Sequence, residues 1–138
     1  MNCRLFSNFP ELVDFLQISD FPRFFKVIDC AKNGLESEGV ELNWLLVLYS
    51  KWKAIREGVR GQASFRRKNI FKTNLQKYET AVIFGAESLM GDLEPKLGEM
   101  RTDTRLLACR FPLPKSEKFQ LLTQIGEGID AVWVYKRV

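Results

Sequence analysis

The feature that most constrains the fold of this chain is a short predicted strand that passes directly into a helix. One acidic residue lies at the junction. Residues 39–47 read Gly-Val-Glu-Leu-Asn-Trp-Leu-Leu-Val, so that Glu41 closes the strand and Asn43 can cap the helix. In a doubly wound α/β fold, such a carboxylate faces the ligand crevice, where it can accept both hydroxyls of a nucleotide ribose. A carboxylate is also favourable near the start of a helix through the helix dipole. From the residues alone, both interpretations of Glu41 stay open.

The rest of the chain alternates strand and helix patterns. Residues 80–84 are mostly apolar, as in a central strand buried on both faces. Pro95 predicts a break or kink in a helix over 88–100, whereas residues 115–128 read as polar and irregular. The chain ends on two strands without an intervening helix, which predicts a mostly parallel sheet with an antiparallel strand at its C-terminal end. Strands are predicted over 38–42, 62–67, 80–84, 105–111 and 129–135, and helices over 44–57 and 88–100.

The helix over 44–57 carries one apolar stripe at helical spacing, and this stripe is expected to be buried. Its members are Leu45, Leu48, Trp52 and Ile55. The three tryptophans of the chain, Trp44, Trp52 and Trp133, are interpreted as packing residues rather than as an aromatic cage. Gly58 is expected to end the helix.

The absence of histidine removes several kinds of chemistry. Histidine general bases, Ser-His and Cys-His pairs and histidine metal ligands are all excluded. The three cysteines, Cys3, Cys30 and Cys109, are widely spaced, so neither a disulfide framework nor a zinc site is expected. Cys109 lies in an apolar segment and is expected to act as a small buried hydrophobe.

The length of the chain and its first residues limit the number of domains and the targeting signals that it can contain. The 138 residues suffice for one domain, and no apolar run approaches the ~18 residues of a membrane-spanning helix. Residues 1–12 contain a single basic residue, Arg4, and match neither a signal peptide nor a transit peptide. The expectation is a cytosolic protein, or one whose targeting signal lies outside this chain.

Several segments together resemble one family. They are residues 40–45, 67–72, 82–85, 108–114 and 126–130, and the most specific are Arg-Phe-Pro-Leu-Pro at 110–114 and Gly-Glu-Gly-Ile-Asp at 126–130. Over roughly residues 31–138, the chain resembles the mitochondrial protein-lysine N-methyltransferases that act on the ATP synthase c subunit or the adenine nucleotide translocase.

The resemblance implies an α/β fold, namely the seven-stranded doubly wound sheet of class I methyltransferases that depend on S-adenosylmethionine. It implies that Glu41 binds the ribose of this cofactor, and that Asn69 and the backbone amide of Ile70 contact the adenine. The family has aspartate where this chain has Asn69, and an ordinary loop asparagine is the alternative. The implied substrate is a lysine of a mitochondrial inner-membrane protein, with the ATP synthase c subunit favoured, and the implied location is the mitochondrion.

The chain departs from the family at its start. Family members begin the fold with a strand and a glycine-rich loop that holds the methionine end of the cofactor. Here the corresponding residues 13–23 have no glycine, and Phe21-Pro22 cannot supply the open backbone that such a loop needs. The fold is therefore expected to be N-terminally incomplete, with a divergent helical segment over 1–34 and the C-terminal part of the methyltransferase-like domain over 35–138.

Loss of the central first strand would leave two apolar strand edges unpaired, with residues 13–18 as a candidate substitute strand. Weak or absent cofactor binding is predicted. The alternative to an enzyme is a catalytically inactive, truncated protein or a partner-binding module.

Basic residues concentrate in one part of the chain. They are Lys51, Lys53, Arg56, Arg60 and the run at 66–68. The net charge of +4 is too small to argue for nucleic acid, no nucleic-acid motif accompanies these residues, and a solvated face is the simplest interpretation. A second interpretation is peripheral contact with anionic membrane lipid, since the family's substrates are membrane proteins. The oligomeric state is left open.

Overall fold

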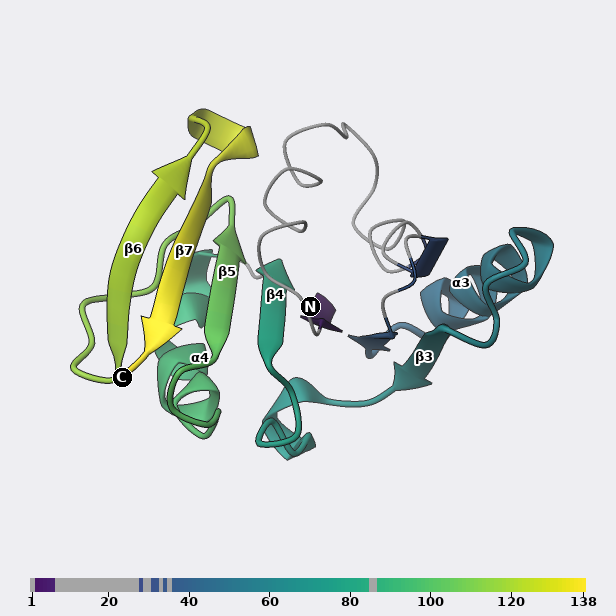
Figure 1. The fold of residues 1–138 in the computed structure, drawn as a ribbon, viewed down its shortest axis with the longest axis horizontal. Coiled ribbons are helices and arrows are strands. Elements are labelled where there is room, and N and C mark those ends of the chain that lie inside the picture. Colours follow the sequence, from purple (N-terminus) through teal and green to yellow (C-terminus); the bar gives the residue numbers. More distant parts are fainter. Residues whose placement is uncertain (1, 7–27, 29–30, 33, 35, 85–86) are drawn as a thin grey trace.

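Strands from both ends of the chain meet in one sheet (Figure 1). The computed structural model describes residues 2–6, 28, 31–32, 34, 36–84 and 87–138. The described strands lie in the order β3-β2-β1-β4-β5-β7-β6. Their bounds are β1 Asn2–Phe6, β2 Ser37–Glu41, β3 Ala63–Arg67, β4 Thr80–Phe84, β5 Arg105–Cys109, β6 Phe119–Ile125 and β7 Val132–Arg137.

Strand direction separates β1 and β7 from the other described strands. Strands β2 to β6 all run the same way, because β2–β3 and β4–β5 pair in parallel and β1 and β7 are antiparallel to their neighbours. The antiparallel C-terminal end is confirmed by β7. The prediction of mostly parallel pairing is wrong, because the reversed β1 makes two central pairings antiparallel.

The central position of the sheet is filled by the first residues of the chain. Cys3 pairs with Val40 of β2 on one side and with Ile83 of β4 on the other. The expected pair of open strand edges is therefore wrong, and so is the helical expectation for residues 2–6. A buried strand edge needs backbone hydrogen-bond partners, and a short extended segment can supply them from either direction. The candidate substitute strand, residues 13–18, lies outside the described residues.

Strand β6 was missed from the sequence. It lies at the edge of the sheet, pairs only with β7 among the described strands, and exposes five of its seven residues. An edge strand with little burial has no apolar alternation to detect. Its register shifts between Leu121 and Thr123, which disturbs the pattern further.

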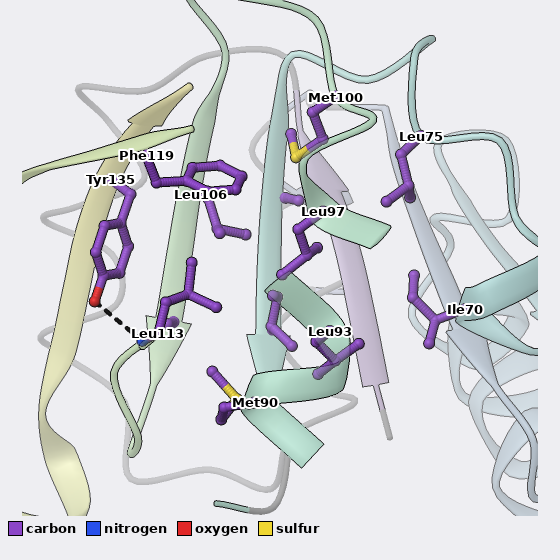
Figure 2. Packing of buried hydrophobic residues seen from close by; sticks show 13 residues of the cluster. Ile70, Leu75, Met90, Leu93, Leu97, Met100, Leu106, Leu113, Phe119 and Tyr135 are labelled. Atoms are coloured by element: carbon purple, nitrogen blue, oxygen red, sulfur yellow. Dashed lines mark hydrogen bonds between the residues drawn. The ribbon is translucent and has the colours of Figure 1, made fainter. Parts of the chain in front are cut away.

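One face of the sheet packs on α4, Met90–Leu97, which follows a 3₁₀ turn over Glu87–Leu89 (Figure 2). Pro95 lies in the last turn, and the helix ends two residues later. On β4, Val82 is fully buried on the face opposite to Ala81 and Ile83, which confirms a central strand buried on both sides. The cluster on the α4 side includes Ile70, Leu75, Met90, Leu93, Leu97, Met100, Leu106, Leu113, Phe119 and Tyr135.

The helix α3, Trp44–Arg56, covers β2 and β3 near the other edge of the sheet. Asn43 caps it, as predicted, by accepting a hydrogen bond from the Leu45 amide at 3.0 Å. The predicted burial of its apolar stripe is wrong. The buried side carries Val47, Ser50 and Ala54, while Leu45, Leu48, Trp52 and Ile55 are exposed.

The interpretation of Trp44 and Trp52 as packing residues is also wrong, since each is about half exposed. Small side chains on the buried side let α3 approach Ala63 and Phe65 of β3 closely. None of the described helices combines the length and the apolar character needed to cross a bilayer.

Candidate functional site

The carboxyl ends of four described strands meet at one edge of the sheet, because β2, β3, β4 and β5 run in the same direction. The strands end there at Glu41, Arg67, Phe84 and Cys109. In open α/β sheets, ligands bind outside the carboxyl ends of the strands. This end of the strands, called the ligand edge below, is therefore the candidate site.

Glu41 sits at the last position of β2 and is partly buried. Its Oε1 accepts a hydrogen bond from the Asn43 amide at 3.1 Å, directly before the first turn of α3. This bond orients the carboxylate, a group that offers about four acceptor positions in all. The structure shows the structural interpretation of Glu41, a carboxylate at the start of a helix, and binding of a ribose stays a prediction.

Asn69 follows β3 by two residues and lies at the neighbouring corner of the same edge. Its Oδ1 accepts from the Phe71 amide at 3.0 Å and caps a 3₁₀ turn over Ile70–Lys72. The Ile70 side chain is buried in the main core, so that a ligand can meet this residue only through its backbone.

The structure brings the predicted residues to adjacent corners through a contact that the sequence analysis missed. Arg67 is the register partner of Glu41 in the parallel pair β2–β3. Its Nε donates to the Leu42 carbonyl at 3.1 Å, which ties the end of β3 to the turn before α3. Arg67 lies only two residues before Asn69 in the sequence. Its contact with Leu42 could not be predicted, however, because that contact depends on the register between β2 and β3.

The reversed β1 changes what this edge can offer. Asn2 pairs with Phe84, so β1 begins at the ligand edge, and Phe6 pairs with Thr80 at the opposite edge. In a parallel central strand, the loop that follows the strand would lie at the ligand edge. Here the chain leaves β1 at the other edge, and the described residues therefore supply no loop after β1 at the site.

A cavity of about 430 Å³ lies elsewhere, at the starts of β2 and β3. Its Glu38 carboxylate accepts from the Tyr78 hydroxyl at 2.8 Å and pairs with Arg66 Nε at 3.3 Å and Lys77 Nζ at 3.6 Å. These bonds satisfy the carboxylate and fasten β2 to its surroundings. The cavity is at the edge opposite to Glu41 and is not part of the candidate site.

The pKa shifts of Glu57 and Tyr135 both arise from contacts that serve the fold. Hydrogen bonds from Lys32 and then Lys53 lower the pKa of Glu57, which joins α3 to the helical residues 31–32. Burial raises the pKa of Tyr135, whose hydroxyl accepts from the Leu113 amide at 3.0 Å (Figure 2).

The sheet order, the reversed β7 and the carboxylate after β2 define an α/β fold of the methyltransferase kind. An RNA methyltransferase from Salinibacter ruber, solved in complex with S-adenosyl-L-homocysteine, has the same fold with a TM-score of 0.75. The likeness covers 95% of this chain and 92% of that one, at 17% sequence identity.

Residues 25–120 match the family of the ANTKMT methyltransferase domain, and the chain belongs to this family. It is 67% identical over 111 residues to the Caenorhabditis elegans lysine N-methyltransferase of the ATP synthase c subunit, covering 80% of this chain and 58% of that protein. Identity to the human protein of the same name is 44% over 110 residues, which is 79% of this chain and 46% of that protein.

The adenine nucleotide translocase lysine N-methyltransferase of Mus musculus is 36% identical over 98 residues, covering 70% of this chain and 42% of that protein. The chain thus spans about half the length of the curated relatives that it matches. The family expected from the sequence is confirmed.

Proposed function

We propose that this chain is a protein-lysine N-methyltransferase that takes its methyl group from S-adenosylmethionine and acts on the ATP synthase c subunit in mitochondria. The observation that carries the proposal is the 67% identity to the Caenorhabditis elegans protein named for this activity. The location follows from the substrate that this name gives.

The nucleoside half of the cofactor fits the described residues. Glu41 places a carboxylate at the carboxyl end of β2, and the vicinal hydroxyls of a ribose are donors that match such a group. Asn69 uses its Oδ1 as a cap, which leaves its amide NH₂ as the group to meet an acceptor nitrogen of adenine. Ile70 contributes its backbone amide, since its side chain is in the core.

The methionine half of the cofactor lacks a counterpart among the described residues. We infer that the fold is N-terminally incomplete relative to the family, with β1 filling the central strand position in the reverse direction. A glycine-rich loop contributes backbone amides to a carboxylate, and such charge-assisted bonds contribute about 1.5–3 kcal/mol each. Loss of two of them weakens binding by about a hundredfold or more.

When bound, the cofactor would supply a methyl group carried on a sulfonium sulfur. A deprotonated lysine amine would attack this methyl carbon in line as the carbon–sulfur bond breaks, and S-adenosylhomocysteine would leave. The part of the chain that supports this step is positional. Glu41 and Asn69 would hold the nucleoside at the edge where β2 and β3 end.

Two measurements test the proposal. Purified chain, the ATP synthase c subunit and S-adenosylmethionine at millimolar concentration are expected to give lysine methylation of that substrate, read by mass spectrometry. Complete absence of methylation would favour the alternative, an inactive partner-binding module, which the names of the relatives do not favour. Calorimetry with S-adenosylhomocysteine is expected to give a Kd above about 100 μM. Micromolar binding would overturn the incomplete-site inference while leaving the activity intact.

A further inference from the structure

The outward side of α3 gathers six large apolar side chains that are exposed, more than any other described element carries. Its large side chains point away from β2 and β3, whereas the side that packs on the sheet carries Val47, Ser50 and Ala54. A helix at the surface of a soluble protein normally has the opposite arrangement. The exposed set, each between 42% and 59% exposed, is Leu42, Trp44, Leu45, Leu48, Tyr49, Trp52 and Ile55.

The size of this surface sets it apart from scattered apolar residues. Seven large side chains that are about half exposed amount to roughly 600 Å², which is the upper end of what a monomer presents as one patch. The helix lies at the outer margin of the molecule, beyond β3 (Figure 1). Its 13 residues give a face about 20 Å long.

Basic side chains frame the apolar face. At 100° per residue, Lys51 falls on one border of the exposed arc and Lys53 on the other, while Arg56 lies within it. The Arg56 guanidinium stacks 5.3 Å from the centre of the Trp52 ring. Between residues 42 and 56 there is no acidic residue.

The charge of the whole chain concentrates in this region. Residues 42–68 contain seven basic residues and one acidic residue, a net charge of +6. Because the whole chain carries +4, the remaining residues carry −2. The single acid of the region, Glu57, is paired with Lys32 at 2.6 Å and with Lys53 at 3.1 Å.

We propose that α3 docks this protein on an anionic lipid bilayer. The apolar face with its two tryptophans and one tyrosine enters the boundary between headgroups and acyl chains, and Lys51 and Arg56 meet lipid phosphates. A second copy of the chain is a poorer occupant, since a symmetric contact would bring the basic borders of two helices together. The docking stands apart from the proposed enzyme activity and requires no cofactor.

The position of α3 gives the docking a consequence for the candidate site. Leu42 follows Glu41 directly and Trp44 comes three residues after it, so the apolar face begins at the ligand edge of the sheet. A helix seated in the bilayer surface therefore holds this edge next to the membrane. If the proposed function is correct, a lysine of a membrane-embedded substrate would meet the site there.

Sedimentation with lipid vesicles tests the proposal on the full chain without cofactor. Vesicles of phosphatidylcholine with about one third phosphatidylserine are expected to bind the chain at least tenfold more tightly than pure phosphatidylcholine vesicles. The tryptophan emission is expected to shift to shorter wavelength on binding, because Trp44 and Trp52 leave water. Equal binding to both vesicles, or none to either, would overturn the proposal.

Matched variants locate the contact. The double variant Leu45→Gln with Trp52→Gln is expected to lose at least tenfold in vesicle affinity, and Lys51→Glu with Arg56→Glu to lose the preference for anionic lipid. The control, Leu121→Gln with Leu122→Gln, alters two exposed apolar residues of β6 at the opposite edge and should bind as the wild type does. Circular dichroism verifies the fold of each variant.

Unchanged binding of the α3 variants, or equal loss in the β6 control, would refute docking by this face. Light scattering that shows a dimer of the wild type and a monomer of the Leu45 and Trp52 double variant would also refute it, because the face would then bind a second copy of the chain.

Discussion

Glu41 has a structural role at the end of β2 and, in the proposed function, a second role in binding the cofactor ribose. Its Oε1 is held by the Asn43 amide, and this bond fixes the carboxylate at the end of β2. The neighbouring corner is built in the same way, with the Asn69 side chain capping a 3₁₀ turn. In both cases a short local hydrogen bond sets the direction in which the remaining polar atoms can act.

Substitution of Glu41 separates these two roles. Glu41→Gln keeps an oxygen for the Asn43 amide but removes the charge, so we expect adenosine affinity to fall about tenfold with little change in stability. Glu41→Ala removes both, and we expect the same loss of affinity plus about 0.5–1.5 kcal/mol of stability.

Equilibrium dialysis with labelled adenosine and urea unfolding measure the two effects, with the exposed Glu117→Gln as control. Unchanged affinity in both Glu41 variants would remove this residue from the site.

Tyr135 joins the core to a backbone amide. Its hydroxyl accepts from the Leu113 amide, a buried bond, so Tyr135→Phe leaves that amide without a partner and should cost about 1–3 kcal/mol in the free energy of unfolding. Urea unfolding measures the cost. The control is Tyr49→Phe, at a position 42% exposed, with an expected change below about 0.5 kcal/mol.

The pH dependence of the same variant follows from the pKa of Tyr135, which burial raises above its ordinary value. The folded chain then holds the phenol proton more tightly than the unfolded chain, whose tyrosines titrate near pH ~10. The stabilisation is therefore complete below pH ~10 and is lost as the pH rises through the folded pKa. We expect the stability difference between wild type and Tyr135→Phe to shrink above pH ~10, and a constant difference would contradict this assignment.

The element that departs most from its sequence pattern is α3. Its buried side is made of small residues that pack against Ala63 and Phe65, and its exposed side holds the residues whose spacing suggested a core. Glu57 fastens the end of the helix through Lys32 and Lys53. The helix is therefore held on the sheet by small side chains that allow a close approach, and not by large apolar side chains.

A size change on each side of α3 tests this arrangement. Ala54 is 2% exposed, and Ala54→Leu would push the helix away from β3, with an expected loss of about 1–3 kcal/mol in the free energy of unfolding. Ile55→Leu on the exposed side is the matched control and should change stability by less than about 0.5 kcal/mol. Denaturant unfolding compares the two. A larger loss at Ile55 than at Ala54 would show that the helix packs by its other side.

In the whole molecule, the reversed β1 completes the sheet. It pairs with both β2 and β4, so that neither central edge is open. The same direction places its start, rather than its end, at the ligand edge. The direction of β1 thus completes the sheet and places the chain that follows β1 at the edge away from Glu41.

Protection of β1 amides from hydrogen exchange tests its central position. Amides of residues 2–6 that bond to neighbouring strands should exchange as slowly as those of β4, because a central strand opens only with most of the sheet. Arg4→Pro removes a backbone donor there and should cost at least about 1–3 kcal/mol, with association through the opened edges. Lys115→Pro, at an exposed loop position, is the control. Fast exchange at residues 2–6 would contradict the central placement.

The sequence by itself determined the features that depend on near neighbours in the chain. The cap at Asn43, the buried alternation of Ala63 and Phe65, and the central character of Thr80–Phe84 follow from local hydrogen bonding and from the period of the apolar residues. The family followed from short segments kept in order. The placing of Glu41 and Asn69 at one edge required only the prediction that their strands run in parallel.

Only the tertiary structure decided the direction of β1, the strand at β6 and the side of α3 that faces the sheet. Strand direction depends on which edges need partners, and five residues pair equally well in either sense. Exposed β6 carries no alternation to read. An apolar stripe shows that a helix has two different sides, but it does not show which side packs on the sheet. In α3 the side with small residues packs on the sheet, because it allows a closer approach, and the apolar stripe faces outward.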